Sequence, residues 1–513
     1  MLLSGPANDE RDMTKNQRAL VDACFEEGQY EAGISLLMQL RSPRYRPSPS
    51  HIRQLLYIAL YPPPDRESEG LKAVYASPSK IAPAKQKKSA LVPTLTASEA
   101  ARQCLTSFAA TNTPASILRA LPSYPGPEEP VADEAHDIGD EDEDSFISRE
   151  ATNIKQCKNC WAVLREGFIN CSNNESSARD KSTRRRKSTW DGGSDKDSEI
   201  LDPEAPAMVG PQSWPVLDWL LDVFEKDERL TENSGNPRYS PLLLRQIPPA
   251  RAGTGSRWEA DIPLDIVFYC LNQPEPSRRF AGARLMKLMV NLTSVVYFDA
   301  AIFTSAVFAR LTAQKYPSFS EFFSVLPASL VGSKFKLALC RKYLVRPSGQ
   351  SAQAASGPRF QGRIQPRARR RGGVQTGVAE TAQNSKPTSS DPHPHTIASK
   401  LPVPPAGEVL TSLQASRADR RIEELKIKFE WIVTYGKVQE AVPPEGKDNE
   451  WIRLLEDGAF KRAVGQTFEE TPGDTGEQDV CQCMKELLLD MLSHWQNIDA
   501  PAGPAGQCDQ LCT

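Results

Sequence analysis

The sequence has few of the residues and motifs on which catalysis usually depends. It contains five histidines in 513 residues, and it has no GxxxxGK[ST] phosphate loop, no HExxH zinc motif and no GxSxG nucleophile elbow. The GTGSR stretch at 253–257 is too short for a dinucleotide fingerprint. We therefore expect a protein that is not an enzyme and needs no cofactor. A carboxylate or a lysine can replace histidine as a general base, so an enzyme of an unfamiliar type is the alternative.

Apolar residues are also scarce. They form 39% of the chain, against about 45–50% in an average globular protein, a figure that also counts glycine. Proline is frequent, with 42 residues. The most hydrophobic stretch, Leu288–Ala309, is interrupted by Asp299 and falls short of the ~20 apolar residues of a membrane span. The first residues lack the pattern of a signal peptide. We expect helical blocks separated by Pro-, Ser- and Gly-rich linkers, and no membrane contact.

The eleven cysteines are scattered and odd in number, which predicts reduced, mostly buried thiols rather than a disulfide framework. Cys157 and Cys160, with Cys171, are spaced like three zinc ligands. A structural zinc site needs four ligands, and the nearest histidine, His136, lies in an acidic tract. We therefore expect no metal, and interpret residues 150–169 as an amphipathic helix that carries the first two cysteines.

Charge is nearly balanced overall, with a net charge of −3, but it is segregated along the chain. Asp133–Asp144 carries eight acidic residues and no Lys or Arg, whereas Arg341–Val378 carries nine basic residues and no acid. Two basic runs lie in linker-like stretches: Arg184, Arg185, Arg186 and Lys187 form the first, and Arg367, Arg369, Arg370 and Arg371 belong to the second. Such runs suit the acidic grooves of nuclear import receptors, or the phosphates of nucleic acid. The further alternative is solvated linker charge that no partner recognises.

The N-terminal part predicts a pair of short helices. Thr14 and Gln17 form a capping-box pattern, and the sequence LVDACFEEGQYEAGISLLMQL follows, in which Leu20, Cys24 and Phe25 are expected to face inward. This pair resembles the helical hairpin of a tetratricopeptide repeat, with Gly28 and Tyr30 at the turn. The resemblance covers about 30 residues and is not repeated at the next period of ~34 residues. It implies a helical hairpin and carries no function with it.

Helical spacing of apolar residues continues through most of the remaining blocks, and no stretch shows the sustained alternation of a sizeable sheet. A third helix is expected after Ser48, with Pro49 at its first position. The largest apolar block, 213–345, predicts several helices that pack on more than one side. In the C-terminal block, we expect the last helix to bury Val480, Met484, Leu488, Met491 and Trp495.

These patterns predict an all-α fold, an irregular solenoid-like helical array with long disordered linkers. The expected organisation is an N-terminal hairpin plus third helix (12–62), a linker (63–94), a helical pair (95–122), an acidic disordered segment (123–147), a helix (148–171), a basic, Ser-rich linker (172–210), the main helical domain (211–346), a basic Pro/Ser-rich linker (347–409), a C-terminal helical segment (410–499) and a tail (500–513).

Stacked helices commonly present extended surfaces to other proteins. The sequence therefore favours a non-enzymatic nuclear scaffold or adaptor, imported by a nuclear import receptor, with a cytoplasmic pool as a further option. Tyr435, Trp451 and Trp495 are the candidate partner-surface residues if they lie exposed in a groove, and core residues otherwise. The alternative is a nucleic-acid- or chromatin-associated factor whose basic linkers contact phosphates.

Overall fold

The computed structural model describes residues 10–62, 91–124, 145–169, 206–248, 260–295, 298–313, 317–345, 401–415, 422–469 and 475–498. In these stretches the protein is all-α, with 18 α-helices, two 3-10 helices and one two-stranded sheet, so the predicted fold class is confirmed. No helix of this part of the chain is both long and apolar enough to cross a membrane.

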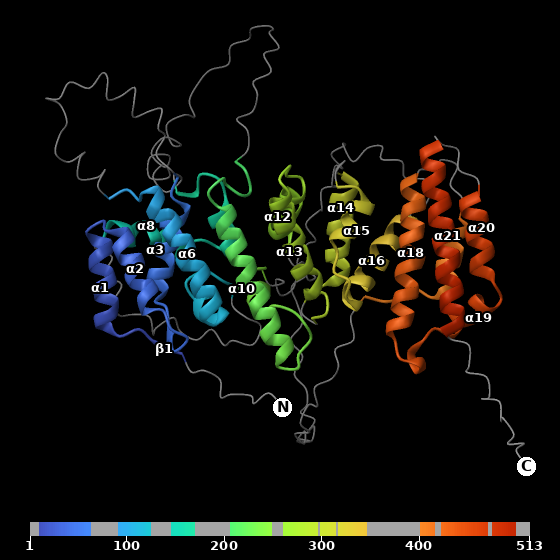
Figure 1. Ribbon diagram of the computed structural model, residues 1–513, viewed down its shortest axis with the longest axis horizontal. Coiled ribbons are helices and arrows are strands. Elements are labelled where there is room, and N and C mark those ends of the chain that lie inside the picture. Colours follow the sequence, from blue (N-terminus) through green and yellow to red (C-terminus); the bar gives the residue numbers. More distant parts are fainter. Residues whose placement is uncertain are drawn as a thin grey trace, which may run out of the picture.

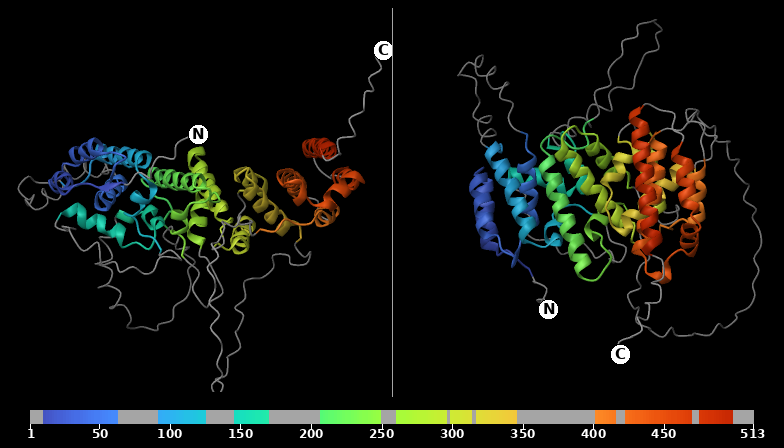
Figure 2. Two further views of the ribbon diagram at one scale, coloured as in Figure 1. Left: turned by 90° about the horizontal axis from the view of Figure 1, so that it is seen from below. Right: turned by 45° about the vertical axis from the view of Figure 1, so that its right-hand side comes forward.

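The helices lie side by side along the long axis of the molecule, largely in the order of the sequence (Figure 1). The two further views show the same progression from the N-terminal to the C-terminal helices (Figure 2). One hydrophobic core runs through the whole series, from Met13 near the start to Trp495 near the end. Helix lengths vary from 4 to 24 residues. The more specific expectation of a solenoid remains a prediction.

The N-terminal part begins with the predicted capping box: Thr14 Oγ1 accepts from Gln17 N at 3.3 Å, and Gln17 Oε1 accepts from Thr14 N at 3.0 Å. The inward face of the first helix differs from the prediction, because Val21 and Phe25 are buried while Leu20 is exposed. The elements are α1 (Lys15–Glu26), α2 (Tyr30–Leu40), α3 (Pro49–Leu60), α6 (Leu95–Thr111) and α7 (Pro114–Leu118), with the parallel strands β1 (Arg11–Asp12) and β2 (Tyr45–Arg46).

The predicted helix over 150–169 is wrong in its extent. Helix α8 (Phe146–Lys155) ends early, and a 3-10 helix, η2 (Cys160–Leu164), follows. Local and distant contacts hold this second turn. Asn159 Oδ1 accepts from Ala162 N at 3.2 Å as the N-cap of η2. Gln246, itself buried, accepts from Cys160 N through Oε1 at 2.9 Å and from Trp161 Nε1 through its carbonyl at 3.2 Å. These bonds fix a second turn that local spacing does not reveal.

The middle of the chain forms helices that pack on more than one side, as expected from their apolar faces. Gly282 allows a close approach, since a Cβ built there would lie 2.8 Å from Cys270 Cβ in the preceding helix. The elements are α10 (Trp214–Asn233), α11 (Pro241–Leu244), α12 (Asp261–Leu271), α13 (Pro276–Leu292), α14 (Ala300–Ala313), α15 (Phe319–Val325) and α16 (Leu330–Leu344).

The C-terminal helices begin at Ala406, slightly before the expected boundary at 410. The buried face of the last helix also differs from the prediction: Leu488 and Trp495 are buried, but Val480 is exposed, because Cys481 and Leu492 take the inward positions instead. The elements are α17 (Ala406–Gln414), α18 (Ile422–Ala441), η3 (Pro444–Gly446), α19 (Asn449–Glu456), α20 (Ala459–Glu469) and α21 (Thr475–Ile498).

Asp448 ties three of these helices together. Its Oδ2 accepts from Ala406 N of α17 at 2.9 Å and from Tyr435 Oη of α18 at 2.8 Å, and its Oδ1 accepts from Glu450 N of α19 at 2.9 Å. Burial raises the pKa of the carboxyl, but the hydrogen bonds from Tyr435 and the backbone amides outweigh it and hold the pKa below the usual 3.8. The ionised carboxylate therefore stabilises the folded state.

We expect Asp448→Asn to lower stability at neutral pH by about 1–3 kcal/mol, because an amide cannot accept all three hydrogen bonds. The folded-state pKa lies below the unfolded one, so the carboxylate's contribution is present above pH ~4 and is lost as pH falls through the folded value. Melting curves of both proteins between pH 7 and pH 3 should therefore converge at the acid end. Asp490→Asn, an equal charge change on the exposed side of α21, is the control at neutral pH. A constant difference across the range would contradict the assignment.

Candidate functional site

Both basic runs, Arg184–Lys187 and Arg367–Arg371, lie outside the described residues. The structure therefore leaves their assignment to an import receptor or to nucleic acid as a prediction.

The three aromatic partner-surface candidates lie in the core of the C-terminal helices. Tyr435, Trp451 and Trp495 are 0%, 1% and 5% exposed. The ring centroid of Trp451 lies 5.1 Å from that of Tyr435 and 5.8 Å from that of Trp495, in edge-on geometry. A partner surface requires these residues to be exposed in a groove, and they are not. They are core residues that fill the space between α18, α19 and α21.

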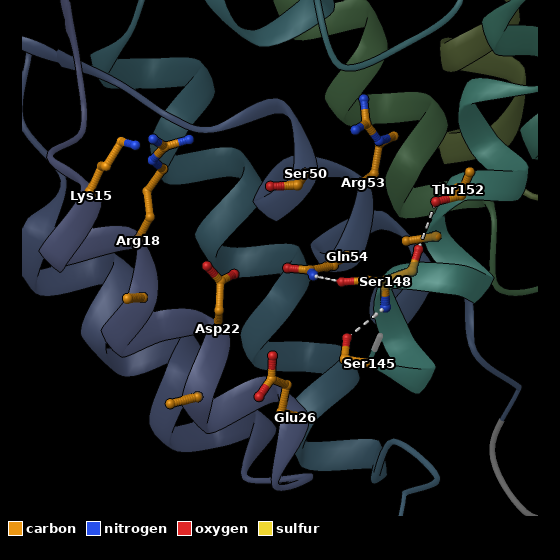
Figure 3. A pocket seen from close by; sticks show the side chains of 13 residues that line it. Lys15, Arg18, Asp22, Glu26, Ser50, Arg53, Gln54, Ser145, Ser148 and Thr152 are labelled. Carbon is orange, nitrogen blue, oxygen red and sulfur yellow. Dashed lines mark hydrogen bonds between the residues drawn. The ribbon is translucent and has the colours of Figure 1, made fainter. Parts of the chain in front are cut away.

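A cavity of about 450 Å³ opens between α1, α3 and α8 (Figure 3). Only three of the side chains that line it are apolar, and all three are alanines. The remaining lining residues are charged or carry hydroxyl or amide groups: Lys15, Arg18, Asp22, Glu26, Ser50, Arg53, Gln54, Ser145, Ser148 and Thr152. A lining of this kind suits a polar or charged ligand rather than an apolar one.

The charges of this cavity are separated in space. Figure 3 shows Lys15, Arg18 and Arg53 toward one end, and Asp22 and Glu26 toward the other. On α1 the separation follows from helix geometry, since residues four apart lie above one another on one face. The four-residue spacing of charged residues at positions 18, 22 and 26 can be read from the sequence. A charged helix face is usually just a solvent-exposed face, so this spacing alone does not identify a site.

Hydrogen bonds hold the walls of the cavity in place. Gln54 Nε2 donates to Ser148 Oγ at 2.8 Å and so joins α3 to α8. Ser145 Oγ accepts from Ser148 N at 3.1 Å as the N-cap of α8. On the other wall, Asp22 Oδ1 lies 2.9 Å from Nε2 of the buried His51. The cavity is therefore bounded by side chains with fixed positions.

A second surface feature lies where the N-terminus of α10 meets the end of α12 and the start of α13. The Trp214 and Tyr269 rings stack with centroids 6.2 Å apart and planes 16° apart, and the Arg278 guanidinium lies 4.8 Å above the Trp214 ring. All three side chains are half-buried, and Phe280, on the same turn of α13 as Arg278, is 65% exposed. We call these four residues the aromatic edge.

The aromatic edge was missed by sequence reasoning. The helical spacing of Trp214, Leu217, Leu221 and Phe224 in the sequence predicts one inward face. The last three residues are buried, whereas Trp214 is only half-buried. Its position in the first turn of α10 places the ring against Tyr269 and Arg278 instead of within the core.

The cysteines of the described residues are free, and five of the eight are buried. Burial raises the pKa of the Cys157 thiol to about 11 and that of the Cys160 thiol well above its usual value, so both are protonated at neutral pH. Within the described stretches no three His, Cys, Asp or Glu side chains are grouped as metal ligands. Cys171, the third member of the sequence pattern, lies outside them.

No protein-family model, no curated protein and no solved structure matches this chain. The resemblance of the N-terminal helical pair to a tetratricopeptide hairpin therefore rests on its own residues alone.

Proposed function

We propose that the protein is a non-enzymatic adaptor that binds other proteins through the surface of its helical array. The aromatic edge carries this proposal. Tryptophan, tyrosine and arginine are the residues most enriched among those that dominate binding energy at protein interfaces. Here Trp214, Tyr269 and Arg278 are stacked in a fixed arrangement, and the exposed Phe280 follows Arg278 by two residues in α13.

Preorganisation strengthens this argument. Arg278 is held by Glu275, with Nη1 3.2 Å from Oε2, and by Gln273 Oε1 at 3.3 Å, in addition to its contact with Trp214. Side chains that are already ordered lose little conformational entropy on binding. The exposed Phe280, two residues after Arg278 in α13, adds apolar area that a partner can cover.

The nuclear part of the proposal rests on the two basic runs alone. We propose that Arg184–Lys187 or Arg367–Arg371 binds an import receptor and directs the protein to the nucleus. The alternative function, a nucleic-acid- or chromatin-associated factor, uses the same arginines for phosphate contacts. It predicts binding that weakens steeply with salt, because each phosphate contact releases a counterion.

Recovery of partners by the intact, tagged protein from its own cells tests the adaptor function. We expect a defined set of proteins to remain bound after nuclease treatment, and Phe280→Ser to reduce their recovery by about tenfold or more, which corresponds to ~1.4 kcal/mol of binding energy. Phe280 is largely exposed, so the fold should be unaffected.

Leu95→Ser is the matched control, because Leu95 is 55% exposed at the start of α6, away from the aromatic edge. Equal recovery by wild type and both variants would rule out the aromatic edge as the binding surface. Loss of all partners on nuclease treatment would favour the nucleic-acid alternative, and neutralising Arg367–Arg371 would then be the next step.

A further inference from the structure

The last described helix, α21, carries two apolar faces, and the other described helices bury only one of them. The buried face, which packs against the rest of the chain, consists of Cys481, Leu488, Leu492 and Trp495. The other face, which we call the outer seam, consists of Val480, Met484, Leu487 and Met491. Val480 and Leu487 are 44% and 48% exposed, and the two methionines are half-buried. The solvent side of a surface helix is usually polar, so an apolar face there indicates a contact with a partner.

The spacing of the outer seam is that of a helix that packs against another helix. Its four residues follow one another at intervals of four, three and four positions. This is the heptad spacing at which the apolar residues of one helix insert between those of a second helix. A single exposed apolar residue is common on protein surfaces, but these four form one stripe that is about 17 Å long. Figure 2 shows α21, in dark red in its left-hand view, projecting from one side of α18 and α20.

The charges beside the outer seam are acidic. Asp479, Glu486 and Asp490 are exposed and lie along its solvent side, at intervals of seven and four positions. Neither Asp479 nor Asp490 has a hydrogen bond or an ion pair within the described stretches. Lys485 is the one Lys or Arg of α21, and its Nζ already lies 3.5 Å from Oε1 of Glu469 in α20. We call the three carboxylates the acidic row; no basic side chain of α21 is left to balance it.

An apolar stripe beside a row of carboxylates is complementary to an amphipathic helix that carries the opposite charge. We propose that the outer seam binds a basic amphipathic helix of a partner protein. The apolar residues of that helix pack along the stripe from Val480 to Met491, and its Lys or Arg side chains face the acidic row. A second copy of this chain is a poorer occupant, because its α21 brings the same acidic row and only a lysine that is already paired.

This inference rests on the proposed adaptor function and adds to it a second surface, separate from the aromatic edge, together with the chemical class of the partner. Model helices test it on the intact protein. The probe is a fluorescein-labelled peptide of three LAALKAK heptads, which places leucines on one face and lysines on both sides of that face. A peptide of three LAALEAE heptads has the same apolar face and the opposite charge.

Fluorescence anisotropy measures the affinity of both peptides. We expect the lysine peptide to bind about tenfold or more tightly than the glutamate peptide, and this preference to shrink as salt screens the acidic row. Leu487→Ser should weaken binding of the lysine peptide by about tenfold or more, because it removes an apolar contact in the middle of the seam. Leu20→Ser is the matched control, since Leu20 is 59% exposed on α1 at the other end of the array.

Charge variants provide a second, independent readout. Asp479→Asn combined with Asp490→Asn should weaken binding of the lysine peptide and reduce its salt dependence, while binding of the glutamate peptide should not weaken. Glu26→Gln combined with Glu27→Gln removes the same charge from exposed positions at the end of α1 and is the control. The melting temperature of each variant verifies its fold.

The outcomes separate this inference from the adaptor function. No binding of the lysine peptide, equal binding of the two peptides, or equal losses with Leu487→Ser and Leu20→Ser would overturn the assignment of the outer seam. A dimer in sedimentation equilibrium that Leu487→Ser dissociates would also overturn it, because a second copy would then occupy the seam. Partner recovery that Phe280→Ser abolishes and Leu487→Ser leaves intact would show that the adaptor function stands without this surface.

Discussion

Gly436→Ala is expected to destabilise the C-terminal helices by about 3 kcal/mol, because the added methyl group overlaps a buried ring. A Cβ at this position in α18 would lie 2.3 Å from Cη2 and 2.4 Å from Cζ2 of Trp495 in α21. Trp495 cannot move away easily, since it packs edge-on against Trp451 in the core. Hydrogen exchange of the α18 and α21 amides, together with the melting temperature, measures the loss.

Gly465→Ala is the control for this prediction. Gly465 lies inside α20, and a Cβ there meets no atom within 4 Å. Alanine is favoured over glycine in a helix by about 1 kcal/mol, so this substitution should be neutral or stabilising. Combining Gly436→Ala with Trp495→Phe should recover part of the lost stability. Equal stability of the two alanine variants would show that α18 and α21 do not pack as described.

Asn291→Leu is expected to destabilise the middle of the array by about 3 kcal/mol, because it leaves a buried carboxylate short of a partner. Glu228 in α10 is 1% exposed, and its Oε1 accepts from Asn291 Nδ2 of α13 at 2.5 Å. Its Oε2 accepts from Arg238 Nε at 3.0 Å. Leucine fills a similar volume but supplies no donor. Urea unfolding of the variant and the wild type measures the difference.

A double substitution distinguishes this electrostatic cause from a packing defect. With Glu228→Leu and Asn291→Leu together, the buried carboxylate of Glu228 is removed, and Arg238, whose side chain is 42% exposed, stays solvated. We expect the double variant to be clearly more stable than Asn291→Leu alone. Asn236→Leu, on the exposed turn after α10, controls for the loss of an asparagine. A double variant less stable than either single one would contradict the role given to Glu228.

Features of the fold that depend on local chemistry could be predicted from the sequence. The capping box at Thr14 and Gln17 and the proline at the start of α3 act within a few residues, and both mark the observed helix starts. The end of α8 could not be predicted in this way. The turn that follows it is bonded to Gln246, a residue more than 80 positions away that the fold brings to Cys160 and Trp161.

The candidate site residues also divide into those that local sequence patterns indicate and those that only the packing of distant segments reveals. The apolar spacing around Tyr435, Trp451 and Trp495 indicates a buried face, but it does not tell which aromatic rings remain at a surface. The exposure of Phe280 could not be predicted, because a single exposed aromatic residue does not disturb the helical spacing of the apolar residues around it. The cavity combines α1 with α3 and α8, and only packing brings Arg18 and Gln54 to one space. Spacing along a single helix cannot reveal such a combination.

Hydrogen–deuterium exchange of the intact protein, alone and with a recovered partner, tests the adaptor function most directly. The account predicts that the partner slows exchange at the start of α13 and the end of α12, where Arg278, Phe280 and Tyr269 lie, and that Phe280→Ser abolishes this protection. Unchanged exchange in these segments with the partner fully bound would contradict the assignment of the aromatic edge as the binding surface.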